Sequence, residues 1–162
     1  MQSETTLSID LPTTPMKKQF LLFIFILVGL IAFNQRALAQ LDSTTHLCTR
    51  HIVPPFVSDG QSYRALVMSG QNAEFHATFF AGTTYRVAAA SGTTDGNLIF
   101  SIYSYDPNTG DRQLIFTNSQ HNNAPYWDFK VNATVEVVIE ASLNPASGKD
   151  SGFAVMAIGF KQ

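Results

Sequence analysis

The sequence predicts an all-β protein, a single antiparallel β-sandwich of jelly-roll type with about eight strands. Apolar and polar residues alternate with period two in successive segments, which is typical of strands with one face in a core. Turn-forming Gly, Pro, Asn and Asp separate these segments roughly every 8–12 residues. Between residues 57 and 162 no amphipathic helical pattern of useful length is present.

A hairpin at residues 97–118 is the centre of the predicted sandwich. Leu98, Phe100 and Ile102 fall on one face of its first strand, and Leu114 and Phe116 repeat this spacing on the return strand. The intervening Asp, Pro, Asn and Gly are turn residues. A hairpin is marginal in water by itself, so the other alternating segments must cover it.

The other strands follow in order from residue 62. In 73–80, Phe75, Ala77 and Phe79 are expected to point inward. The last segment is apolar on both faces, which predicts a central strand covered on two sides. The expected strands are 62–68, 73–80, 84–90, 97–105, 113–118, 126–131, 134–141 and 152–160. The expected aromatic core is Phe75, Phe79, Phe100, Phe116, Trp127, Phe129 and Phe160.

The N-terminal region has the three parts of a secretory signal peptide. Lys17 and Lys18 precede an apolar run at 20–33, and an Ala-x-Ala site ends at Ala39. The run is shorter than the roughly 20 residues of a membrane-spanning helix, so we predict cleavage after Ala39. The alternative is an uncleaved N-terminal anchor. Because polar residues 1–15 precede the basic pair, Met16 is an alternative candidate for the true start.

The expected organisation is a 1–39 extension with signal peptide, a 40–60 linker or short helical turn, and a 61–162 sandwich. The linker carries His46 and His51, expected to be exposed, with Cys48 between them. The spacing of these three residues matches no zinc pattern. As the single cysteine, Cys48 cannot form an intramolecular disulfide, and it is either buried, the commoner state, or a free surface thiol.

Composition excludes some partner classes. The net charge is −2 and only 14% of residues are charged, whereas Phe occurs 13 times. Such a composition is typical of a packed core and not of a disordered chain. It gives no electrostatic reason to expect nucleic acid, and a membrane contact is expected only through an uncleaved signal segment.

Several segments resemble a known family. The stretches 84–90, 95–103, 114–118, 127–129 and 135–140 resemble the strand patterns of the bacterial pre-peptidase C-terminal (PPC) domain and related secreted jelly-roll sandwiches. The likeness covers roughly residues 62–160. It implies a secreted, non-catalytic β-sandwich, usually appended to an enzyme and sometimes calcium-binding.

Two groups of residues are candidate binding sites. Asp106, Asn108 and Asp111 offer closely spaced oxygen ligands of the kind that calcium prefers, although the same residues also suit a plain hairpin turn. The second group is expected near one end of the sandwich, where its rings would stack on a sugar or peptide or else pack against the core edge. It consists of Tyr103, Tyr105, His121 and Tyr126.

A set of outward charged residues offers the minimum for acid–base chemistry, a histidine with a carboxylate. Its members are expected to converge on one sheet surface or to form a solvated polar face. They are Glu74, His76, Arg86, Asp128, Lys130, Glu136 and Glu140. No hydrolase motif accompanies them.

The sequence therefore predicts a secreted, periplasmic or cell-surface binding or scaffold protein without catalysis, whose partner is a protein or a glycan. One alternative is a small secreted hydrolase using His76 and a neighbouring carboxylate. The other is a structural surface subunit that self-associates through an edge strand.

Overall fold

The structure, a computed structural model, describes residues 39–161. They form two antiparallel sheets packed as a sandwich, which confirms the predicted fold class. The predicted signal peptide, apart from its last residue Ala39, lies outside the described residues, as does the alternative start at Met16.

All eight predicted strands are confirmed to within a few residues, and a short extra strand, β1, precedes them in the segment expected to be a linker. The strands are β1 (Val57–Ser58), β2 (Tyr63–Met68), β3 (Asn72–Phe79), β4 (Thr84–Ala90), β5 (Leu98–Tyr105), β6 (Arg112–Thr117), β7 (Tyr126–Lys130), β8 (Val135–Leu143) and β9 (Ser151–Lys161). Two short 3₁₀ helices, η1 (Asn118–Gln120) and η2 (Pro145–Ser147), lie in the connections.

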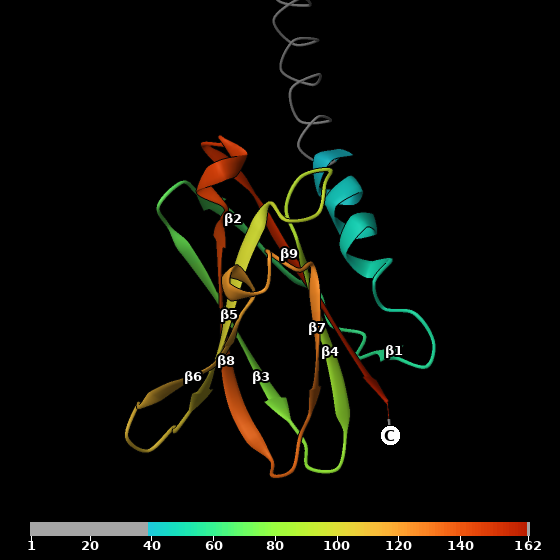
Figure 1. Cartoon of the computed structure of the whole chain (residues 1–162), viewed down its shortest axis with the longest axis vertical. Coiled ribbons are helices and arrows are strands. Elements are labelled where there is room, and N and C mark those ends of the chain that lie inside the picture. The colour runs from blue at the N-terminus through green and yellow to red at the C-terminus, as the bar shows by residue number, and fades with distance from the viewer. Residues whose placement is uncertain (1–38, 162) are drawn as a thin grey trace, which may run out of the picture. The chain divides into compact units, whose positions relative to one another are not determined.

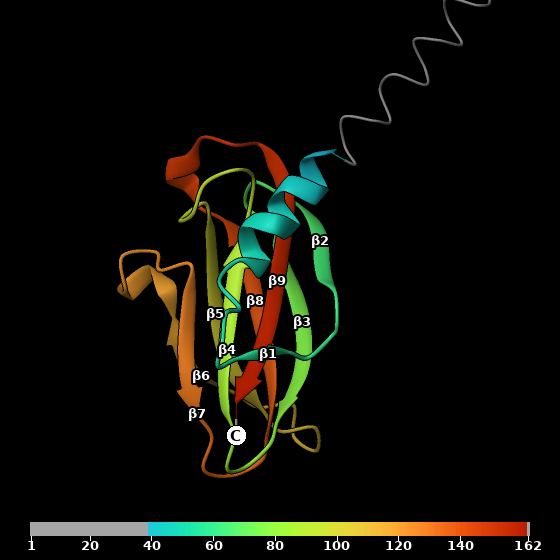
Figure 2. The ribbon, with the colours of Figure 1, turned by 90° about the vertical axis from the view of Figure 1, so that its right-hand side faces the viewer.

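The strand order is that of a jelly roll. In the first sheet, β2 and β1 pair one after the other with the same edge of β9, followed by β4 and β7. In the second sheet the order is β3-β8-β5-β6. Figures 1 and 2 show the two sheets face to face, with β2 and β3 at one edge and β6 and β7 at the other. The central position predicted for the last strand is therefore confirmed.

The core lies between the sheets and contains the predicted aromatic residues. Phe79, Phe100 and Phe116 are buried, and the other four predicted aromatic rings are partly buried against them. The inward orientation predicted for Leu114 is wrong, because this residue is 48% exposed. The pairing of β5 with β6 shifts by one residue after Ile102, and this bulge turns Leu114 to the outer face.

Residues 39–49 form an α-helix of about three turns, where a linker or a short helical turn was expected. Figure 2 shows this helix lying over β9 and β4. Leu47 and Cys48 pack there against the small side chains of Ala88 and Ala157, so the helix covers the outer face of the first sheet. Of the two states left open by the sequence, Cys48 is in the buried one. Within residues 39–161, no helix is long and apolar enough to cross a membrane.

A glycine allows the chain to run closely over β9 after the helix. A Cβ atom at Gly159 would lie 2.7 Å from Cγ2 of Ile52 and 3.3 Å from Cβ of Phe56. The missing side chain therefore lets residues 52–56 lie directly on the strand. The chain then forms β1 and reaches the sheet edge, where the amide of Asp59 donates to the carbonyl of Ile158 over 2.9 Å.

Candidate binding cleft

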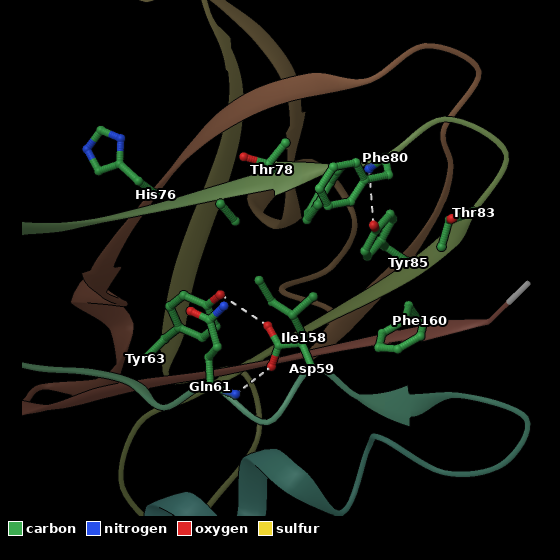
Figure 3. A pocket seen from close by; sticks show the side chains of 12 residues that line it. Asp59, Gln61, Tyr63, His76, Thr78, Phe80, Thr83, Tyr85, Ile158 and Phe160 are labelled. Carbon is green, nitrogen blue, oxygen red and sulfur yellow. Dashed lines mark hydrogen bonds between the residues drawn. The ribbon is translucent and has the colours of Figure 1, made fainter.

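A cleft of about 580 Å³ opens at the edge of the sandwich formed by β2 and β3. One wall is the end of β3 and the residue after it, and the opposite wall is the segment 59–63 between β1 and β2 (Figure 3). The lining residues are Asp59, Gln61, Tyr63, His76, Ala77, Thr78, Phe79, Phe80, Thr83, Tyr85, Ile158 and Phe160. This volume is in the range of pockets that enclose small ligands or side chains.

The strand pairing explains why the cleft is open. β9 pairs with β2 only as far as Tyr63 and with β1 only from Ser58, so the edge of β9 that faces these two strands has no ladder partner at residues 157 and 158. On the other side, β3 pairs only with β8. Because inward Ala77 and outward Thr78 both border the cleft, the edge of β3 forms the wall, with its backbone groups.

Aromatic rings form the apolar part of the cleft. Phe79 and Tyr85 stack with their ring centroids 4.4 Å apart. The hydroxyl of Tyr85 accepts a hydrogen bond from the amide of Phe80 over 3.1 Å, which holds the end of β3 in place. The Phe80 side chain itself is 59% exposed at the rim, and Phe160 borders the cleft from β9.

One carboxylate provides the polar part. Oδ2 of Asp59 accepts a hydrogen bond from the hydroxyl of Tyr63 over 3.1 Å, and Oδ1 accepts one from the amide of Gln61 over 2.9 Å. Burial, together with the nearby charge of Asp59, raises the pKa of Tyr63 to about 12. Tyr63 is therefore a neutral hydrogen-bond donor at physiological pH.

The structure does not bring the four predicted ring residues together, because β5 and β7 belong to different sheets. Tyr103 and Tyr105 lie on β5, and the ring of Tyr105 contacts that of His76 on the second sheet, with centroids 6.0 Å apart. His121 packs on Trp127 with centroids 4.3 Å apart.

The fourth ring, Tyr126, lies on the first sheet. Its ring packs on the guanidinium of Arg86, 4.3 Å from the ring centroid, and its centroid is 5.3 Å from that of His51. Contacts with other residues of the sandwich are thus present for three of the four rings, those of Tyr105, His121 and Tyr126.

The outward charges do not converge on one surface. Glu74, His76, Glu136 and Glu140 belong to β3 and β8 of the second sheet, whereas Arg86, Asp128 and Lys130 belong to β4 and β7 of the first. Outward side chains of the two layers point in opposite directions, which separates the two groups.

Each charged group has its own ion pairs. Arg86 forms a two-pronged pair with Asp128 over 2.7 and 2.9 Å. Arg112 bridges Glu74 over 2.9 Å and Glu140 over 3.1 Å, and its hydrogen bond lowers the pKa of Glu74. Within residues 39–161, no hydrogen bond joins His76 to a carboxylate.

The predicted calcium ligands lie in the turn between β5 and β6. Oδ1 of Asp106 accepts hydrogen bonds from the backbone amide and the side-chain amide of Asn108, over 2.9 and 3.2 Å. The backbone hydrogen bond is the main reason that the pKa of Asp106 is lowered. Asp111 closes the same turn through its carbonyl, which accepts from the amide of Asp106. In the part of the chain that the structure describes, no three His, Cys, Asp or Glu residues cluster in a way that could hold a metal ion. These contacts fit the plain hairpin turn, the alternative to a calcium site.

His51 departs from the expectation of an exposed linker histidine. Its side chain is only 14% exposed, and its Nε2 lies 3.1 Å from Oδ1 of Asp95. The other oxygen of this carboxylate, Oδ2, pairs with Arg50 over 2.7 Å. Burial acts to raise the pKa of Asp95, but hydrogen bonds with His51 and Arg50 outweigh it and hold the pKa below its usual range. These contacts join the end of the helix to the loop between β4 and β5.

Asp59 and Gln61 were not among the predicted site residues. Gly60 between them has a φ of +76°, and the amide of Gln61 donates to Oδ1 of Asp59, so the alternation of β2 does not extend to them. An aspartate in a turn before a strand matches no binding motif, and only the tertiary structure places it in the cleft.

No protein-family model matches the chain. No curated protein matches it either. Among solved structures, the chain is similar to PliG of Aeromonas hydrophila, described as a periplasmic lysozyme inhibitor of g-type lysozyme. The TM-score is 0.44 and the sequence identity 14%, over 67% of this chain and 89% of PliG. A similarity of this degree carries no inference, so the cleft is interpreted from its own residues.

Proposed function

We propose that this chain is an exported, non-catalytic binding module that holds an extended segment of a protein partner in the cleft between β3 and residues 59–63. The observation that carries the proposal is the shape of this cleft: an aromatic-lined space along a free strand edge. An extended peptide can add to such an edge through backbone hydrogen bonds while its alternate side chains enter a pocket.

Two features favour binding over hydrolysis. The ring of His76 projects away from Tyr63 and Asp59 in Figure 3, so the histidine does not face the carboxylate of the cleft. The signal-peptide pattern and the resemblance to the PPC domain, both taken from the sequence, support a secreted or periplasmic module without catalysis. A protein partner is favoured over a glycan because the backbone edge of β3 forms a wall of the cleft.

The proposal is tested by selecting extended peptides from a random display library on the purified protein. Phe80→Ala removes an aromatic ring from the rim, and because this side chain is 59% exposed the substitution leaves the core intact. The matched control is Leu66→Ala, which truncates a 61% exposed apolar side chain on β2 that does not line the cleft. We expect peptides whose affinity falls with Phe80→Ala and is unchanged with Leu66→Ala.

Three results would overturn the proposal. The first is a selection that yields no binding peptide. The second is a set of peptides that bind the Phe80→Ala protein as well as the wild type. The third is that no peptide is selected but the protein binds glycans on an array, and that this binding is lost with Phe80→Ala. This result would identify the cleft as a sugar site.

A further inference from the structure

We propose that the cleft takes up a cationic side chain, a lysine or arginine, from an extended segment that lies along β3. This inference rests on the proposed function and adds the chemistry of the group recognised. It follows from the rings, the carboxylate and the absence of a lysine or arginine among the cleft residues.

The walls of the cleft have the composition of a cation site. Aromatic rings attract a positive charge placed over their faces, and the attraction is larger where water is excluded. The alkyl stem of lysine or arginine also packs well on such rings while its charged end reaches a polar group. The rings that line the cleft are those of Tyr63, Phe79, Phe80, Tyr85 and Phe160.

Asp59 supplies the negative charge. Its carboxylate accepts two hydrogen bonds, from Tyr63 and Gln61, and a carboxylate has about four acceptor positions, so it can accept more. No salt bridge joins Asp59 to a basic residue within residues 39–161. An incoming ammonium or guanidinium would form a charge-assisted hydrogen bond there.

The lining of the cleft contains no lysine or arginine that would fill this position from inside. Lys161 follows the cleft residue Phe160, but its ammonium lies 4.8 Å from the ring centroid of Phe56, which packs on the outer side of β9. Glu136 is exposed but pairs with Thr78 from β8, at the edge of β3 away from the cleft, so Asp59 is the one carboxylate among the lining residues. A lining with one carboxylate and no lysine or arginine is complementary to a basic side chain.

The test uses three capped pentapeptides that differ only at the centre: Thr-Val-Lys-Val-Thr, the same peptide with norleucine, and the same peptide with glutamate. Norleucine keeps most of the apolar stem of lysine and removes the charge. Dissociation constants are measured by NMR titration at low salt. We expect the lysine peptide to bind roughly tenfold more tightly than the norleucine peptide, and the glutamate peptide to bind most weakly.

Two variants locate the charge. Asp59→Asn keeps the shape of the side chain, and we expect it to make the lysine and norleucine peptides bind equally. Tyr63→Phe removes the hydrogen bond to Asp59 but keeps the carboxylate, so the preference for lysine is expected to remain. Thermal melts of both variants check that they fold, and the wild-type ratio of lysine to norleucine binding decides the question even if Asp59→Asn unfolds.

The outcomes separate this inference from the proposed function. Equal binding of the lysine and norleucine peptides, or a preference for glutamate, would overturn the cation site and leave peptide capture standing. A lysine preference that survives in folded Asp59→Asn would also overturn it. If none of the peptides binds at all, and the display library yields none, both proposals fall.

Discussion

The hydroxyl of Tyr63 donates a hydrogen bond to the carboxylate of Asp59 over 3.1 Å, and this contact joins the first residue of β2 to the segment that follows β1. The pair forms the polar wall of the cleft, opposite the edge of β3. Asp59 presents a negative charge to a ligand in the cleft. The same carboxylate contributes to the raised pKa of Tyr63, so the pair also affects how this tyrosine titrates at alkaline pH.

Tyr63 is expected to ionise only at about pH 12, because burial and the charge of Asp59 raise its pKa from 10.0. An unfolded tyrosine releases its proton near pH 10, so between about pH 10 and 12 the folded state binds more protons. The free energy of unfolding therefore falls as the pH rises through this window. Ultraviolet titration of the phenolates measures the pKa.

The comparison variant for this titration is Tyr63→Phe, in which the absorbance change at the highest pH should be lost. The contrary result is a Tyr63→Phe curve with the same shape as the wild-type curve and an absorbance change that is smaller by the same fraction at every pH. It would show that Tyr63 ionises together with the other tyrosines and that its bond to Asp59 is absent in solution.

Cys48 is expected to be unreactive in the folded protein. The thiol is fully buried and donates to the carbonyls of Ala88 and Val155, and burial raises its pKa to about 12. Because the thiolate is the reactive form, a thiol reagent at pH 8 should label it only after denaturation. A second cysteine introduced as Thr49→Cys, at an exposed position of the same helix, should react at once. Rapid labelling of wild-type protein would show that the helix leaves the sheet.

Asn118 is expected to be a strong determinant of stability. Its buried side chain accepts from the amide of Phe100 over 2.9 Å and donates to the carbonyls of Leu98 and Ala124 over 3.0 and 3.1 Å. Asn118→Ala leaves these buried groups without partners, which should lower the free energy of unfolding by at least about 2 kcal/mol. Chemical denaturation measures this. Asn132→Ala, at an exposed position, is the control and should change little.

Phe100→Ala should lower the free energy of unfolding by about 3–5 kcal/mol, since it leaves a cavity in the centre of the core. The side chain of Phe100 is 0% exposed, whereas that of Phe80 is 59% exposed. The same substitution at Phe80 should therefore cost much less. Equal shifts of the two denaturation midpoints would contradict the position of Phe100 in the core.

Calcium is expected to leave the thermal midpoint unchanged. Asn108 directs its side-chain nitrogen and not its oxygen toward Oδ1 of Asp106, so the amide oxygen of Asn108 does not join the carboxylate in one set of ligands. Melts in EDTA and in excess calcium check this, because a ligand at one hundred times its dissociation constant raises stability by roughly 2.7 kcal/mol. A clear rise in calcium, lost in Asp106→Asn, would instead assign a metal site to the turn.

Features that depend on a residue and its immediate neighbours were predictable from the sequence. Side chains alternate along any extended strand, so the inward positions of Phe75, Phe79 and Phe100 follow from their spacing. The central position of β9 follows in the same way, because a strand that is apolar on both faces must be covered on both. The turn residues between strands mark the strand ends for a similarly local reason.

Features that depend on pairing between distant segments were decided only by the tertiary structure. The one-residue shift between β5 and β6 exposes Leu114, and the distribution of strands between two sheets separates His76 from Arg86. The cleft also has this origin, since it exists where β1 and β2 leave a gap along β9 opposite β3. The alternation of a strand specifies which side chains share a face, but it contains no information about which strand lies alongside, and that choice places Asp59 among the aromatic rings.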